Sequence, residues 1–143
     1  MKMSNLILVN LMNTLEGYSD KKLPQKISFA ITRNLMKISK EYGAYDAQLK
    51  KIFEMYSDYM VKDDNGEIKT TPNGIPIVSD LMKTEFNEQI AELLNIEIEV
   101  EMYFIDPEVF NYDDKGIYDA MSAQDIMILQ SILCKQNDEV TNE

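Results

Sequence analysis

The sequence predicts an α+β fold: a helical hairpin with one long helix, a small three-stranded antiparallel sheet and two further helices. A heptad repeat of apolar residues runs from Ile31 to Tyr59 and predicts the long helix. Asn-Gly pairs at 65–66 and 73–74 lie between short β-prone segments and predict tight turns. The stretch NIEIEVEMYFI, residues 95–105, alternates apolar with acidic side chains, as a half-buried strand does.

The first part of the chain predicts two helices of unequal length. Residues 4–17 place their leucines on one face and end at Gly17. Pro24 suits the first turn of a second helix, which is expected to continue from about 25 to 62. Such a helix is about 57 Å long, at about 1.5 Å per residue. Gly43 is the position at which it could instead break, because glycine costs about 1 kcal/mol relative to alanine inside a helix.

The heptad seam of the long helix extends beyond the reach of the first helix. Its members are Ile31, Leu35, Ile38, Tyr42, Tyr45, Leu49, Ile52, Tyr56 and Tyr59. The part from Tyr45 to Tyr59 must be covered either by the rest of the chain or by a second copy. Tyr45, Tyr56 and Tyr59 are therefore the candidate self-association residues of a homodimer. The flanking positions lack the charge pairs of a free coiled coil, which favours packing within the chain.

The middle of the chain predicts a hairpin and a strand that pairs with it. A β-hairpin is expected to close at Asn73-Gly74, between Ile68 and the run from Ile75 to Val78. Pro76 confines its strand to an edge or an irregular pairing. The strand within 95–105 most simply joins this hairpin, which completes a three-stranded antiparallel sheet.

Two further helices frame the strand. One is capped by Ser79 or Asp80, runs to about Leu94 and ends at Asn95 in the left-handed conformation. The last helix begins at a capping box of the S-x-x-D kind. Its buried face is expected to be Ile126, Leu129, Ile132 and Leu133. The chain is expected to form a single domain over 1–136, followed by a disordered tail over 137–143.

Composition argues against an enzyme, a cofactor and a metal site. There is no histidine, so the usual general base and the commonest metal ligand are both missing. A single arginine offers no cluster for gripping phosphates, and a single cysteine excludes a cage of cysteine ligands for a metal ion. No nucleotide-binding or nucleophile motif occurs. No apolar run approaches the roughly 20 residues that span a bilayer, so no membrane association is expected.

Charge is divided unevenly along the chain. Residues 1–62 hold ten basic and six acidic residues, whereas residues 63–143 hold four basic and nineteen acidic residues. The net charge of −11 argues against direct nucleic-acid binding, because a surface that binds the phosphate backbone must carry cations. The asymmetry suits a basic protein surface as partner, or the opposite half of a second copy. Simple solubility is the alternative explanation.

Two acidic rows are the candidate partner-binding residues. The first is Glu85, Glu88 and Glu92 on one side of the third helix; the second is Glu97, Glu99 and Glu101 on one face of the strand. A solvent-facing strand surface explains the second row most simply. Same-face carboxylates in a strand lie about 6.6 to 6.8 Å apart, too far to share a metal ion without other ligands. The remaining interpretation is a surface built for cations.

The segments LPQKISFAITRNL and ELLNIEIEVE resemble a family of small uncharacterised proteins encoded in phages and prophages of low-GC Gram-positive bacteria. The resemblance covers most of residues 4–134 and implies a phage setting in the host cytoplasm. It assigns no activity to any residue. With the charge layout, it predicts a non-catalytic inhibitor of a host nucleic-acid-handling defence enzyme, such as a nuclease, that acts as a DNA mimic in the manner of an anti-CRISPR protein. The alternative is a structural or assembly component of a phage particle that self-associates through the long helix.

Overall fold

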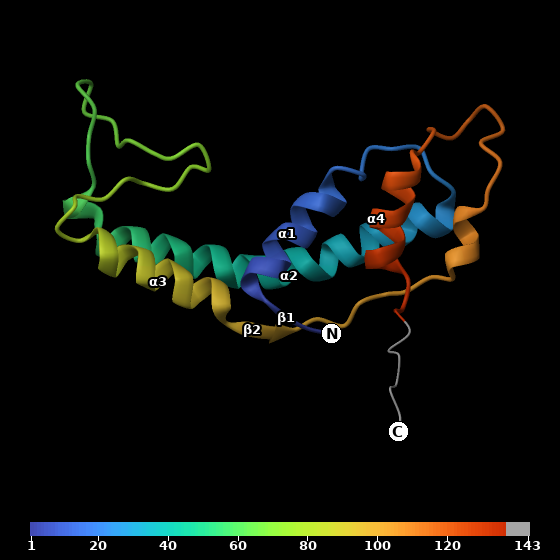
Figure 1. Cartoon of the computed structure of the whole chain (residues 1–143), viewed down its shortest axis with the longest axis horizontal. Helices are drawn as coiled ribbons and strands as arrows, with labels where there is room; N and C mark the ends of the chain where they lie inside the picture. The colour runs from blue at the N-terminus through green and yellow to red at the C-terminus, as the bar shows by residue number, and fades with distance from the viewer. Residues whose placement is uncertain (137–143) are drawn as a thin grey trace.

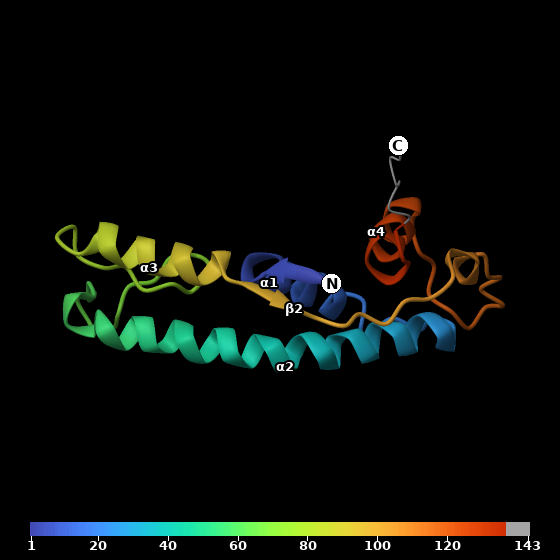
Figure 2. The ribbon, with the colours of Figure 1, turned by 90° about the horizontal axis from the view of Figure 1, so that it is seen from below.

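A single helix, α2 (Gln25–Met55), runs along the molecule, and the other helices lie on one side of it (Figure 1, Figure 2). The structure is a computed structural model that describes residues 1–136, so the predicted tail over 137–143 lies outside the described residues. The elements in chain order are β1 (Lys2–Ser4), α1 (Asn5–Glu16), α2, the 3₁₀ turn η1 (Ser57–Tyr59), α3 (Lys83–Asn95), β2 (Glu97–Glu99), the 3₁₀ turn η2 (Pro107–Phe110) and α4 (Ala123–Leu133).

The long helix is continuous but shorter than predicted. Gly43 lies inside α2 without breaking it, and the 31 residues span about 46 Å. The helix ends at Met55 rather than near residue 62. The reason is that the following residues are extended and pair with a later segment: Val61 N–H donates to the Ile77 carbonyl at 2.8 Å, and Ser79 N–H donates to the Tyr59 carbonyl at 2.8 Å.

Two hydrophobic cores share the buried stripe of α2. The N-terminal half of α2 packs with α1, α4 and the residues after β2, around Leu8, Ile31, Val100 and Leu129. The C-terminal half packs with α3 and the segment before it, around Ile52, Tyr56, Phe86 and Leu93. The rest of the chain thus covers the heptad seam up to Tyr56, as favoured from the sequence, whereas Tyr59 stays exposed.

The predicted three-stranded sheet is wrong. Within residues 1–136 the structure has four α-helices and one two-stranded antiparallel sheet, in which β1 pairs with β2 with Met3 opposite Ile98. The fold is therefore mixed α+β and mostly helical. The predicted strand does not reach the hairpin because α3 first carries the chain about 20 Å back along α2. There it meets the N-terminus of α1 and pairs with the residues that precede it.

The predicted hairpin segment forms a separate arrangement of its own. Its two turns are alike: Asp63 N–H donates to the Glu67 carbonyl and Thr71 N–H donates to the Ile75 carbonyl, each at 2.8 Å. Gly66 and Gly74 occupy the positive-φ position of each turn. Beyond the turns, three backbone hydrogen bonds join positions 61, 69 and 77 in a closed ring, with N–O distances of 2.8 to 2.9 Å. These segments pair only as isolated bridges, so they provide no regular sheet for a further strand to join.

Two buried asparagines fix where the chain crosses α1 and α2. Asn34, fully buried on α2, donates from Nδ2 to the Tyr103 carbonyl at 2.9 Å, and its Oδ1 accepts from the Tyr103 N–H at 2.7 Å. Asn5, at the start of α1, donates from Nδ2 to the Leu93 carbonyl at 2.8 Å. Asn34 provides the partners of the Tyr103 N–H and carbonyl, whereas the Leu93 carbonyl accepts from the Ile96 N–H as well as from Asn5.

The ends of α3 differ from the prediction, and the start of α4 agrees with it. α3 begins at Lys83 without a side-chain cap, and Asn95 is its last residue rather than a left-handed one. α4 begins at the predicted capping box between Ser122 and Asp125. Asp125 also accepts a hydrogen bond from the Tyr18 hydroxyl at 2.8 Å, which lowers the pKa of its carboxyl and ties α4 to the end of α1.

None of the helices described over residues 1–136 combines the length and the apolar character needed to cross a membrane.

The first prediction concerns the Asn34 contact. Asn34→Leu leaves the backbone N–H and carbonyl of Tyr103 without their partners, and is expected to lower the free energy of unfolding by about 2–4 kcal/mol. Urea unfolding followed by circular dichroism measures the change. The control is Asn87→Leu at an exposed position of α3, which should change it by less than about 0.5 kcal/mol. Equal effects of the two substitutions would contradict the role assigned to Asn34.

The second prediction concerns Gly43. A Cβ at this helical position meets no atom within 4 Å, so Gly43→Ala is expected to raise the free energy of unfolding by about 0.5–1 kcal/mol. The matched control is Gly66→Ala, where φ is +79° and the added side chain is expected to cost about 1 kcal/mol. Thermal unfolding of both variants is sufficient. A destabilising Gly43→Ala would show that the helix bends there.

Candidate partner-binding surface

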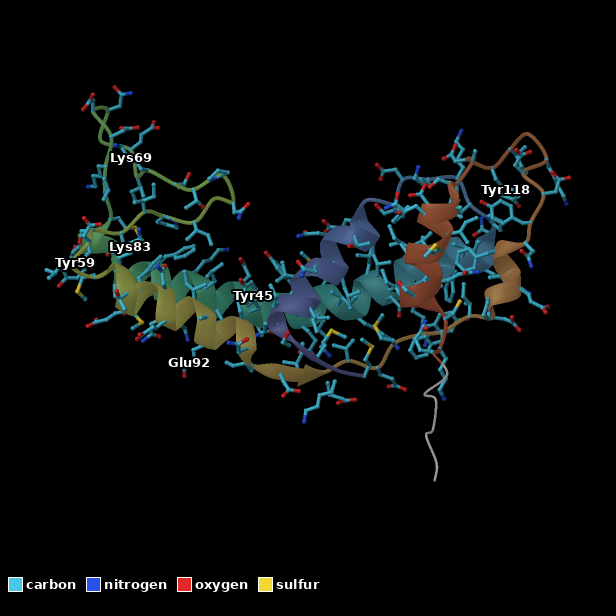
Figure 3. The ribbon with its side chains drawn as sticks, viewed as in Figure 1. Tyr45, Tyr59, Lys69, Lys83, Glu92 and Tyr118 are labelled. Atoms are coloured by element: carbon cyan, nitrogen blue, oxygen red, sulfur yellow. The ribbon has the colours of Figure 1, made fainter. Side chains whose placement is uncertain are left out.

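The three glutamates of α3 lie away from its buried side. Phe86, Ile90 and Leu93 face α2, and the exposed Glu85, Glu88 and Glu92 follow at the spacing of one helical stripe. Figure 3 shows that Glu92 and Lys83 point to opposite edges of the molecule, with Lys83 on the side of residues 60–82. α3 therefore presents one acidic edge.

The strand glutamates continue this edge without an intervening loop. β2 begins two residues after α3 ends. Glu97, Glu99 and Glu101 are exposed, while Val100 is buried in the N-terminal core. The six glutamates form what we call the acidic row: Glu85, Glu88, Glu92, Glu97, Glu99 and Glu101. The sequence predicted both halves of this row, and the structure places them end to end.

The acidic row borders two hollows beside α2. We call the line of these hollows the seam, as distinct from the heptad seam of apolar residues on α2. One hollow of about 290 Å³ lies between the C-terminal half of α2 and α3. It is lined by Gln48, Lys51, Ile52, Met55, Gln89, Glu92, Leu93 and Ile96. A second hollow of about 330 Å³ lies between the middle of α2 and the strand. It is lined by Lys37, Lys40, Glu41, Glu99, Val100 and Glu101.

Charges along the seam are largely unpaired. Among the described residues there are two ion pairs, Lys50 with Asp46 and the amine of Met1 with Glu99, each at 2.9 Å. The ammonium of Lys37 donates instead to the backbone carbonyl of Glu101 at 2.7 Å. Five of the six glutamates in the row thus have no cationic partner within residues 1–136. Their charge remains available to an outside partner.

The seam also has an apolar part that the sequence did not predict. Met55 and Ile96 border the first hollow and are 61% and 49% exposed. The alternating pattern had placed Ile96 on the buried face of the strand, but the strand begins only after it. The periodicity of α2 held a usable signal, since Gln48, Lys51 and Met55 share one helical stripe away from the heptad seam.

The candidate self-association tyrosines do not form one surface. Tyr56 is 6% exposed and its ring packs edge-on against Phe86, with centroids 5.4 Å apart. Tyr45 is half-buried, and its burial, with Tyr42 and Asp46 nearby, raises the pKa of its hydroxyl. Tyr59 is 41% exposed and lies beyond the C-terminal end of α2, whereas Tyr45 lies near α1 (Figure 3). α3 and the segment before it cover most of what the sequence left open to a second copy.

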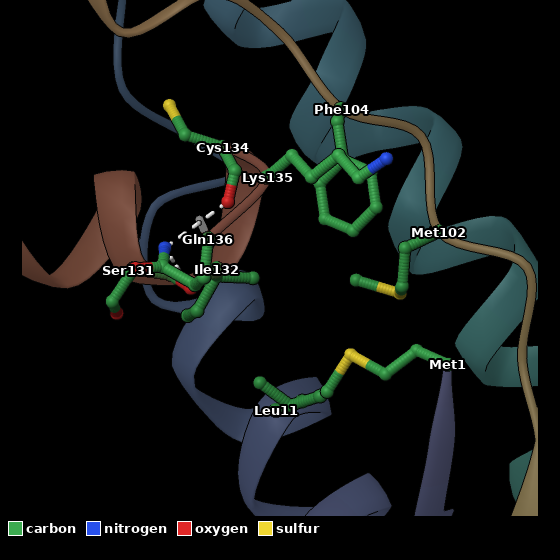
Figure 4. A pocket seen from close by; sticks show the side chains of 9 residues that line it. All are labelled: Met1, Leu11, Met102, Phe104, Ser131, Ile132, Cys134, Lys135 and Gln136. Atoms are coloured by element: carbon green, nitrogen blue, oxygen red, sulfur yellow. Dashed lines mark hydrogen bonds between the residues drawn. The ribbon is translucent and has the colours of Figure 1, made fainter. Parts of the chain in front are cut away.

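A further hollow, larger than the two of the seam, lies elsewhere and carries no catalytic arrangement. It has a volume of about 520 Å³ and lies between α1, α4 and the strand, where Met1, Leu11, Met102 and Ile132 make it mostly apolar (Figure 4). Two of its polar side chains bond to the chain itself: Ser131 O–H donates to the Ile128 carbonyl, and the Gln136 amide donates to carbonyls at the end of α4. Burial raises the pKa of the Cys134 thiol, which disfavours the reactive thiolate.

Within the described residues, no group of three or more cysteine and acidic side chains is placed to hold a metal ion. Comparisons with protein-family models, with curated proteins and with solved structures found no match to this chain.

The third prediction is that Glu88 and Glu92 of the acidic row have no structural role. Glu88→Gln and Glu92→Gln together remove two exposed carboxylates that make no ion pair among the described residues. The apparent Tm is expected to change by less than about 2 °C. Differential scanning calorimetry measures this. A fall of several degrees would show that these carboxylates serve the fold rather than a partner.

Proposed function

We propose that this chain is a non-catalytic protein-binding inhibitor that places its acidic row on a basic surface of its partner. In its sharpest form, the partner is a host nuclease or related defence enzyme, and the acidic row occupies the channel that normally holds nucleic acid. The observation that carries the proposal is the row itself. Six exposed glutamates, five of them without a cationic partner in the described chain, are distributed over about 35 Å of continuous chain from α3 through β2.

The acidic row has the electrostatic properties that such a channel selects. A channel that binds nucleic acid neutralises phosphates with lysines and arginines, and most of its affinity comes from these contacts. A continuous row of carboxylates can engage the same cations and can steer association at a distance. The carboxylate spacing of about 6.8 Å along the strand equals two base-pair rises, but every strand has this spacing. The length of the row and its unpaired charges are the stronger support.

The seam beside the row supplies the apolar contacts that charge alone lacks. Exposed ion pairs contribute about 0.2–1 kcal/mol each, so a tight complex also needs buried apolar contacts at its centre. Met55 and Ile96 provide exposed apolar surface next to Glu92. A partner that combines a basic rim with one apolar side chain fits this surface best.

The setting we propose is the cytoplasm of a phage-infected bacterium. The resemblance of LPQKISFAITRNL and ELLNIEIEVE to phage-encoded proteins supports it. The alternative function, a structural or assembly component of a phage particle, depended on self-association through the exposed end of the long helix. Because Tyr56 is buried against α3 and Tyr45 is half-buried, we favour the inhibitor.

The fourth prediction tests this function by charge reversal. Replacing Glu88, Glu92 and Glu97 with lysine is expected to abolish capture of basic partners from a host lysate at low salt. The wild type should capture a basic nuclease or related enzyme at low salt and lose it at about 0.5 M salt, because screening weakens such contacts. The measurement is an affinity pulldown with quantitative mass spectrometry.

The control reverses three other exposed acidic residues, Glu16, Glu54 and Asp64, which produces the same change of net charge outside the row. This variant should retain at least half of the captured partner. Equal loss in both variants would show that net charge, rather than the acidic row, drives capture. Unchanged capture after reversal of the row would refute the proposed function.

A further inference from the structure

We infer that the seam is also a self-complementary docking surface, on which a second copy of the chain binds about a two-fold axis that runs along α2. The seam has an acidic bank on α3 and the segment that follows it, and a basic bank on α2. Figure 2 shows that α3 and β2 lie alongside α2. Among residues 1–136, no ion pair joins the two banks within one copy. A second copy, turned over, brings opposite charges together.

The two banks face each other at two levels of the seam. Lys51 and Gln48 of α2 lie across the first hollow from Glu92 and Gln89 of α3. Lys37 and Lys40 lie across the second hollow from Glu99 and Glu101. No ion pair joins these side chains in the described residues, although each group of charges lines the same hollow. The charges are therefore matched in position along α2 but separated across the seam.

Symmetry then selects one arrangement of the two copies. A two-fold axis along the seam places the basic bank of one copy on the acidic bank of the other. Residues at a given position along α2 then face the residues at the same position in the mate. Lys51 then meets Glu92 of the mate, and Lys40 meets Glu99 of the mate. A two-fold axis across the seam would place lysine against lysine and is disfavoured. The result is an isologous dimer with parallel α2 helices, of the commonest symmetry class.

The apolar residues of the seam fall at the centre of this interface. Met55 on α2 and Ile96 at the end of α3 are both well exposed in one copy and line the first hollow, so the mate covers both in the proposed dimer. An apolar centre with a charged rim is the usual anatomy of a protein interface. The two hollows extend over positions 37–55 of α2, about 27 Å at about 1.5 Å per residue, so the contact is expected to be smaller than the ~800 Å² per copy of a standard interface. The dimer is therefore expected to be reversible.

This inference does not depend on the proposed function, but the two share Glu92. A basic partner that occupies the acidic row must displace the second copy, so dimerisation regulates access to the row. The basic bank separates the two ideas experimentally. Lys51 contributes to the dimer and has no part in binding a basic partner.

The fifth prediction is a charge-swap experiment on Lys51 and Glu92. Sedimentation equilibrium from about 1 to about 100 µM should show wild-type protein moving from its monomer mass of 16.5 kDa towards twice that mass. Lys51→Glu and Glu92→Lys should each weaken dimerisation about tenfold, because the symmetric interface contains each contact twice. The double variant should recover to within about threefold of the wild type. A wild type that stays monomeric, or a double variant as weak as the single ones, overturns the inference.

The partner pulldown on the same variants keeps the two proposals distinguishable. Lys51→Glu should lose the dimer and keep the basic partner, whereas Glu92→Lys should lose both. A second measurement tests the axis: Ile96→Cys should form a disulfide-linked dimer on mild oxidation, since position 96 lies beside its own mate. Asn13→Cys, exposed on α1 away from the seam, should not cross-link. Equal cross-linking of the two variants refutes the proposed geometry.

Discussion

The whole arrangement depends on α2 burying one stripe of its surface without interruption. Both hydrophobic cores are built on that stripe, one around Ile31 and Ile38 and the other around Ile52 and Tyr56. The elements of each core pack against α2, so each core depends on the apolar residues that α2 contributes. Because most helical stability comes from tertiary packing, the two cores also explain how a helix with a central glycine stays straight. Both cores need the residues of α2, and α2 in turn is stabilised by packing in both cores.

The acidic surface follows from how the chain returns along this helix. α3 runs back beside the C-terminal half of α2, and Asn5 and Asn34 then fix the crossing of the strand through hydrogen bonds to backbone carbonyls and amides. The apolar residues of α3 and of the strand are buried in the two cores, so the glutamates between them are exposed. Since α2 contributes lysines to the facing bank, the fold sets two rows of opposite charge side by side. Local packing thus determines an electrostatic pattern that no single segment contains.

Residues with local signals could be predicted from the sequence, and those that depend on long-range pairing could not. The heptad seam, the capping box at Ser122 and the exposure of all six glutamates follow from periodicity and side-chain chemistry. The partner of the strand was predicted wrongly, because alternation in NIEIEVE fixes which side chains are buried but not which segment pairs with it. The N-terminal residues that do pair with it, Lys2–Ser4, are too few to carry a strand signal. The seam needed the structure, since its banks lie about fifty residues apart in the chain.

α2 is one continuous helix, and both cores are built on it. Double electron–electron resonance between spin labels at Lys26 and Lys51, both exposed on α2, tests it directly. A continuous helix predicts one narrow distance distribution centred near about 37 Å, apart from the length of the labels, at about 1.5 Å per residue. A broad distribution, or a population several ångströms shorter, would show that the helix bends or breaks near Gly43. The two cores would then not share one continuous helix, and the seam beside that helix would not be continuous.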